Sequence, residues 1–166
     1  MPGVTVNVVS EVKAVRFPRQ KLAKLVRAVC TRFGLENAAV DIAIVDNSSI
    51  RKLNKRFLNR KAVTDCLAFD LSQPGENLRR FELVVNGERA ASESAQRNHS
   101  VGAEVALYVT HGLLHNLGFN DLLPKDAKRM HRLEDEILQQ QGFGRIYEKM
   151  KNPQRPATPF GRPKNL

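Results

Sequence analysis

A chain of 166 residues is long enough for one domain with a single hydrophobic core, and 42% hydrophobic content suits a globular fold. Its 27 lysine and arginine residues outnumber 17 acidic ones, and the net charge of +10 favours an anionic partner such as nucleic acid. No apolar run approaches the roughly 20 residues that cross a bilayer, and the N-terminus lacks the pattern of a secretion signal. Composition therefore argues against a membrane protein or an exported one.

Strands and helices alternate in the first part of the chain. Val4, Val6 and Val8 alternate with polar residues, which is typical of a half-exposed strand. Pro18 suits the start of a helix, and Gly34 suits the position just past its end. In chain order, these patterns predict a strand at 4–8, a helix at 18–33, a strand at 40–44 and a short helix at 46–57.

The second part of the chain predicts a pair of strands followed by three helices. The strands lie at 65–69 and 81–85, with a loop that contains Pro74-Gly75 between them, and we expect them to pair antiparallel. The helix at 100–117 is apolar around most of its circumference, so we expect it to be central and buried. The other two helices are predicted at 88–96 and 125–140.

Residues 149–166 differ from the rest of the chain. They contain five basic residues, no acidic residue and four prolines, which predicts an extended, flexible basic tail behind a domain at 1–148. Without this segment the net charge is still +5, so the domain itself is basic. The tail either adds salt-dependent phosphate contacts or serves only as a solubilising appendage.

Cysteine usage indicates the compartment. Cys30 and Cys66 fall inside a predicted helix and a predicted strand, where a cysteine acts as a small apolar packing residue. Two unpaired cysteines fit a reducing environment, so we expect a cytoplasmic protein. The isolated His99 and His131 are expected at the surface.

A metal-binding pattern lies at the end of the predicted central helix. His111 and His115 are four residues apart and therefore share one helix face, so both imidazoles can reach one ion. Gly118 tolerates positive φ and lets the chain turn back, which brings Asp121 within reach of the same ion. Gly112 stands where zinc peptidases carry a glutamate, which argues against peptide hydrolysis. Within a helix, Gly112 indicates close approach of another backbone or of substrate.

These residues resemble a known family. His111-Gly112-x-Leu114-His115-x-x-Gly118-Phe119 is similar to the signature of the YbeY family of metal-dependent endoribonucleases. The segments 64–69 and 82–85 resemble two strand motifs of that family. The resemblance runs from about residue 4 to about residue 148.

Three positions depart from the family pattern. Asp121 replaces the histidine that serves as the family's third ligand, which relaxes the preference for zinc towards harder ions. Leu58 replaces an arginine, and Ala68 replaces a serine. Arg60 or Arg56 could stand in for the missing arginine, and we take Arg60 as the candidate catalytic residue.

The sequence predicts a single α+β domain with a mixed four-stranded sheet and about five helices. We expect one divalent metal ion, Zn²⁺ by preference, bound by His111, His115 and Asp121. The resemblance implies a single-strand-specific endoribonuclease in ribosomal RNA processing, including 16S rRNA 3′-end maturation, and in late ribosome quality control. Its implied partners are single-stranded or ribosomal RNA and ribosomal particles, with no membrane. The alternative is a ribosome-associated RNA-binding factor whose metal is structural and whose catalysis is weak or absent.

Overall fold

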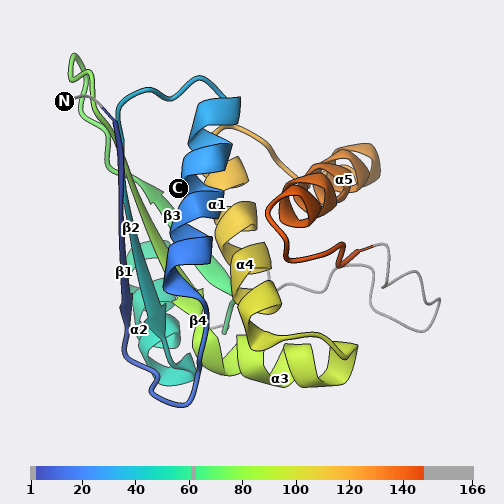
Figure 1. Ribbon diagram of the computed structural model, residues 1–166. Coiled ribbons are helices and arrows are strands. Elements are labelled where there is room, and N and C mark those ends of the chain that lie inside the picture. The colour runs from blue at the N-terminus through green and yellow to red at the C-terminus, as the bar shows by residue number, and fades with distance from the viewer. Residues whose placement is uncertain (1–2, 61–62, 148–166) are drawn as a thin grey trace.

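The computed structural model describes residues 3–60 and 63–147, so the predicted C-terminal tail lies outside the described residues. Within these ranges, five helices and a four-stranded mixed sheet form one α+β domain, as predicted (Figure 1). In chain order the elements are β1 (Val4–Ser10), α1 (Arg19–Arg32), β2 (Ala38–Val45), α2 (Asn47–Leu58), β3 (Cys66–Asp70), β4 (Arg79–Asn86), α3 (Gly87–Arg97), α4 (Val101–Asn116) and α5 (Pro124–Gln140).

The strand order in the sheet is β1-β2-β4-β3. β1, β2 and β4 are parallel, and β3 pairs with β4 in the antiparallel direction. Parallel neighbours need a long crossover, which α1 supplies between β1 and β2. The antiparallel pairing of β3 with β4 was predicted and is confirmed.

Helices cover both faces of the sheet. α1 and α4 pack on one face, where they share the main hydrophobic core with the inward side chains of β2 and β4 (Figure 1). α2 packs on the opposite face, where Ile50 lies against Val45 and Val84. This division places the histidine-bearing helix α4 on the α1 face of the sheet.

α4 is the central helix of the domain. Its residues from Gly102 to His115 are all buried, because the sheet, α1, α3 and α5 surround it. The Ser100 hydroxyl caps its N-terminus by accepting a hydrogen bond from the backbone N–H of Ala103 at 3.1 Å. The predicted central position of this helix is confirmed, and its burial holds the two histidines in a fixed place.

Both histidines outside the motif have partners that the local sequence did not indicate. The side chain of His99 is only 8% exposed, and its Nε2 lies 2.7 Å from a carboxylate oxygen of Glu104. His131 is half-buried, and its ring stacks on Tyr147 with centroids 3.9 Å apart. Both were predicted to be exposed and both are half-buried instead, because each packs against a partner at least five residues away along the chain.

The two cysteines are buried and unpaired, as expected for apolar packing residues. Burial raises the pKa of both thiols. Among the described helices, none combines the length and the apolar character needed to span a bilayer.

Candidate metal centre

The two histidines of α4 converge on one point. The Nε2 atoms of His111 and His115 lie 2.9 Å apart, and the rings meet edge to face with centroids 4.4 Å apart. His111 is fully buried and His115 is 8% exposed. The four-residue spacing predicted this arrangement, because one turn of helix separates the two side chains.

The outer nitrogen of each ring is held by a separate acceptor. His115 Nδ1 lies 3.0 Å from the carbonyl oxygen of Phe119, which can only accept, so Nδ1 carries the proton and Nε2 presents its lone pair. His111 Nδ1 lies 3.2 Å from a carboxylate oxygen of Glu134 on α5. Such contacts fix the ring orientation of histidines that bind metal.

Asp121 completes the group. α4 gives way to Gly118 with φ at 98°, and the chain turns back so that Asp121, only 6% exposed, faces the histidines. One ligand atom from each of the three residues lies within 4.8 Å of the others. The structure thus brings together the three residues that the sequence selected.

The chemistry of this group fits a divalent cation. Two imidazole nitrogens and one carboxylate form a ligand set that catalytic zinc sites use, with a further position open. Asp65 Oδ2 and Glu134 Oε1 are buried nearby and accept no hydrogen bond from any described residue. Because uncompensated buried carboxylates are costly, a bound cation would offset the negative charge gathered here.

The buried carboxyl groups near the triad have raised pKa values. Burial raises the pKa of Asp65 to about 6, against the opposing influence of His111 and Arg89. Burial also raises the pKa of Glu134 well above its ordinary value, and the nearby Asp135 and Asp121 add to the increase. A cation at the triad would favour the charged form of these groups and lower both pKa values.

Glu134 and Asp65 were not among the predicted site residues. Glu134 lies between Met130 and Ile137 on the buried face of α5, at helical spacing. The sequence therefore did contain a signal for Glu134, because a charged residue on an otherwise apolar helix face often has a buried partner. Asp65 lies at the start of β3, and no local pattern indicates that this strand packs against α4.

Gly112 is explained by the packing of α4 against the sheet. A Cβ atom at this position would lie 2.9 Å from Cys66 Sγ and 3.0 Å from Leu83 Cδ2. The sequence left open whether another backbone or substrate approaches here. The neighbours are side chains of β3 and β4, so Gly112 lets the helix lie close to the sheet.

The sequence matches the family model described as Endoribonuclease YbeY over residues 7–142. The chain belongs to the YbeY family. It is 35% identical over 141 residues to the Endoribonuclease YbeY of Anaeromyxobacter sp. (strain Fw109-5), covering 84% of this chain and 73% of that protein. It is 32% identical over 122 residues to the Endoribonuclease YbeY of Caldicellulosiruptor bescii, covering 66% of this chain and 77% of that protein.

A solution structure of a Thermotoga maritima protein is also similar, with a TM-score of 0.54. The match covers 92% of this chain and 100% of that chain at 19% sequence identity, so it shows a shared fold. The predicted α+β fold is therefore shared with a solved structure.

The position at which YbeY relatives were expected to carry arginine lies away from the triad. Leu58 ends α2 and joins the apolar cluster on the sheet face opposite α4. Arg60 is half-buried two residues later, and within the described ranges no hydrogen bond or ion pair joins it to the triad. Arg56 lies over the ring of Phe57, 5.4 Å from its centroid. The role of Arg60 therefore stays a prediction.

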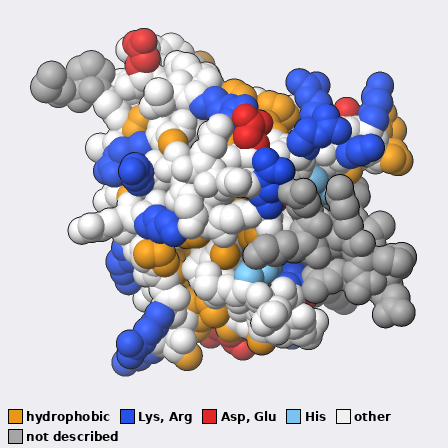
Figure 2. All heavy atoms as spheres, turned by 45° about the vertical axis from the view of Figure 1, so that its right-hand side comes forward, with side chains coloured by type: hydrophobic (Ala, Val, Ile, Leu, Met, Phe, Trp, Pro, Cys, Tyr) orange, Lys and Arg blue, Asp and Glu red, His pale blue; other side chains and the backbone are white. Residues whose placement is uncertain are grey.

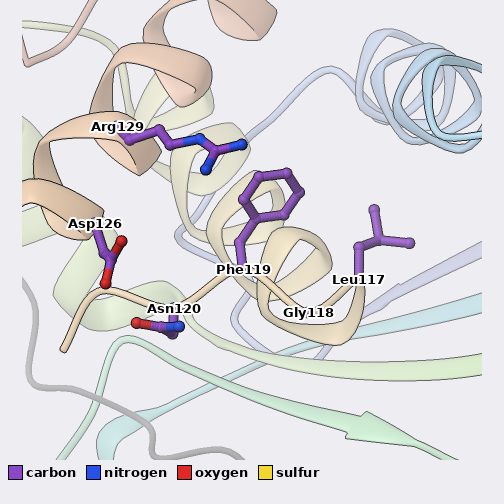
Figure 3. Close-up of a pocket in the computed structure, with 6 residues that line it drawn as sticks. All are labelled: Leu117, Gly118, Phe119, Asn120, Asp126 and Arg129. Carbon is purple, nitrogen blue, oxygen red and sulfur yellow. The ribbon is translucent and has the colours of Figure 1, made fainter. Parts of the chain in front are cut away.

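A surface pocket is lined by the segment that links α4 to α5, just before the ligand Asp121 (Figure 3). Its volume is about 240 Å³, and it lies between the segment that follows α4 and the first turns of α5. Arg129 reaches over the ring of Phe119, with Cζ 5.9 Å from the centroid. The pocket is lined by Leu117, Gly118, Phe119, Asn120, Asp126 and Arg129.

The surface of this YbeY-family protein is basic around α5. Figure 2 shows a face on which lysine and arginine side chains outnumber acidic ones, and histidine side chains reach the surface among them. The exposed basic residues of α5 are Lys125, Lys128, Arg129 and Arg132. This distribution suits a polyanion approaching the triad.

Proposed function

We propose that this protein is a metal-dependent endoribonuclease that cleaves single-stranded RNA. The proposal rests on the convergence of two imidazoles and one carboxylate in a buried group, in a chain of the YbeY family. The relatives are named Endoribonuclease YbeY. The protein would act in the cytoplasm. Its roles there would be ribosomal RNA processing, including 16S rRNA 3′-end maturation, and late ribosome quality control.

The triad residues would hold the metal ion, with Zn²⁺ as the preferred occupant. When bound there, a divalent ion supplies a Lewis acid and lowers the pKa of water at the open position. Phe119 and Glu134 keep the lone pairs of both histidines directed at the site. Asp121 contributes one negative charge, which weakens attraction of a phosphodiester relative to a site with three neutral ligands.

Two further features support an RNA substrate. The net charge of +10 favours polyanions, and the exposed basic side chains of α5 lie on the helix that also carries Glu134, the partner of His111. We propose that residues 1–148 form the nuclease domain and that the basic segment 149–166 adds salt-dependent phosphate contacts. RNA within ribosomal particles is the partner that this charge and the family suggest.

Arg60 is proposed as the cation that stabilises negative charge developing on the scissile phosphate. Removing such a group typically lowers the rate by a factor of about 10² to 10³. Arg60→Ala should therefore reduce cleavage strongly, and Arg56→Ala tests the alternative candidate four residues earlier. An unchanged rate in Arg60→Ala would remove Arg60 from the mechanism.

A second function remains worth testing because Leu58 packs against the sheet, where it offers no charge to a substrate. In this alternative the protein is a ribosome-associated RNA-binding factor, and its metal is structural. Such a factor would bind RNA and zinc with little or no cleavage.

The test combines zinc analysis with cleavage of single-stranded and structured RNA. We expect wild-type protein to bind one zinc ion and to cut the single-stranded substrate, and His111→Ala to lose both properties. Asp121→Asn should weaken zinc binding, whereas Asp41→Asn, the same substitution at an exposed position, should not. Zinc loss in His111→Ala without any change in cleavage would refute the nuclease proposal. Zinc binding without cleavage in wild-type protein would favour the alternative.

A further inference from the structure

The pocket that follows α4 is lined by one acidic and one basic side chain. Asp126 and Arg129 are three residues apart on α5 and both line the pocket. Among the described residues, no ion pair or side-chain hydrogen bond joins either side chain to another residue; the guanidinium of Arg129 lies over the ring of Phe119. A charged side chain that lines a pocket and forms no ion pair there can bind a ligand of complementary charge or hydrogen bonding.

The pocket and the triad share one short stretch of chain. The carbonyl of Phe119 holds His115, while the ring of the same residue lines the pocket. Asn120 also lines the pocket, and the next residue is the ligand Asp121. A group bound in the pocket would therefore contact the same short segment that carries the ligand Asp121.

The pocket suits a planar ring system better than a phosphate. Its volume of about 240 Å³ is roughly eight times the ~30 Å³ that a water molecule occupies in the liquid. A phosphate would face the carboxylate of Asp126, which repels it. Single-stranded bases stack on aromatic rings and on arginine side chains, and the pocket offers Arg129 lying over one face of the Phe119 ring.

Polar groups in the pocket match the hydrogen-bonding edge of guanine. The carboxylate of Asp126 can accept two N–H groups. The amide of Asn120 accepts from the backbone N–H of Leu122 at 3.3 Å, which leaves its NH₂ group as a donor. Guanine presents two adjacent N–H donors beside a carbonyl acceptor, a combination that adenine, cytosine and uracil lack. Figure 3 shows Asp126 and Asn120 on one side of the pocket and Phe119 with Arg129 on the other.

We propose that this pocket binds a guanine base of single-stranded RNA and that Asp126 selects it. The proposal builds on the proposed function, because the bound base would belong to the strand whose phosphate faces the triad. Asp126 is then a specificity-determining residue, separate from the residues that would hold the metal.

Binding of short RNA strands tests the pocket without requiring cleavage. The probes are single-stranded uridine oligonucleotides that carry one guanosine, one inosine or one adenosine. Inosine keeps the N1–H donor of guanine but lacks its amino group. Fluorescence anisotropy in the presence of a chelator gives the affinity of each strand for wild-type protein. We expect the guanosine strand to bind about tenfold more tightly than the inosine strand, the size of one hydrogen bond to a charged group.

Two variants isolate the role of Asp126. Asp126→Asn should bring the guanosine-to-inosine ratio close to one, because one carboxylate acceptor becomes a donor. Glu136→Gln removes the same charge from an exposed position on the same helix and should keep the wild-type ratio. Equal affinities in wild-type protein, an unchanged ratio in Asp126→Asn, or no binding of any strand would each overturn the proposal.

Cleavage of the same strands with zinc separates this proposal from the proposed function. Cuts concentrated beside guanosine in wild-type protein, and redistributed in Asp126→Asn, would support both. A guanosine preference in binding with no cleavage would support the pocket and refute the nuclease. Cleavage without any base preference would support the nuclease and refute the pocket.

Discussion

Replacing Gly112 with alanine tests how closely the histidine-bearing helix lies against the sheet. The new methyl group would lie 2.9 Å from Cys66 Sγ and 3.0 Å from Leu83 Cδ2, and both distances are shorter than ordinary contacts. Leu83 can rotate the end of its side chain, but Cys66 has one rotatable bond and is fully buried. The clash with Cys66 can therefore be relieved only if α4 or the strand β3 shifts.

The expected cost follows from two opposing effects. Overpacking a core by one methyl group typically costs about 1–3 kcal/mol, whereas alanine is favoured over glycine inside a helix by about 1 kcal/mol. The difference predicts a loss of roughly 1 kcal/mol in the free energy of unfolding. For a domain of this size, that loss lowers the melting temperature by about 2–4 °C.

Urea unfolding of metal-free protein measures this loss without a contribution from metal binding. A double-mutant cycle with Cys66→Ala then identifies its source. Without the sulfur atom, Gly112→Ala should cost less by about 1 kcal/mol, because the closest contact is gone. An equal cost of Gly112→Ala in both backgrounds would refute the explanation based on Cys66.

Three further substitutions probe the contacts around α4. Glu134→Gln should weaken zinc binding about 10- to 100-fold in a competition assay with a chelating dye, because His111 loses its carboxylate partner; unchanged affinity would mean that this contact does not orient the ring. Ser100→Ala should lower stability to urea by about 1 kcal/mol, because the N–H of Ala103 loses its cap; an unchanged midpoint would contradict this. Burial raises the pKa of Asp65 from its usual 3.8 to about 6, so the unfolded chain loses this proton first and the carboxyl lowers stability as pH rises between these values. In metal-free protein, Asp65→Asn removes that effect, and its stability relative to wild type should rise by about 2.5 kcal/mol between pH 4 and pH 7; a difference independent of pH would contradict the raised pKa.

Most of the fold could be predicted because each element carries its own periodic pattern. The alternation at Val4, Val6 and Val8 predicted β1, and the structure shows half-buried and exposed residues alternating there. Pro18 and Gly34 marked the ends of α1, which runs from Arg19 to Arg32. Such local signals distinguish strands from helices because side chains alternate every two residues along a strand but repeat about every 3.6 residues around a helix.

The triad could be predicted for a similar reason, since its three residues lie within one helix end and one turn. The residues that surround the triad could not be predicted in this way. Glu134 reaches His111 from α5, and Asp65 lies beside α4 only because β3 is placed at the edge of the sheet. The same limit explains the errors at His99 and His131, whose partners come from other turns and segments.

The segment from Leu117 to Asp121 connects the two sites through different atoms of one residue. The backbone carbonyl of Phe119 orients His115, whereas its ring packs edge-on against Phe33 and lines the pocket. A substitution that changes the ring but keeps the carbonyl in place should therefore separate the two roles. We expect Phe119→Leu to retain one zinc ion per chain by metal analysis and to bind guanosine strands more weakly, because leucine offers no face for stacking. Loss of zinc in this variant at unchanged stability would mean that the ring, and not only the carbonyl, holds the metal centre together.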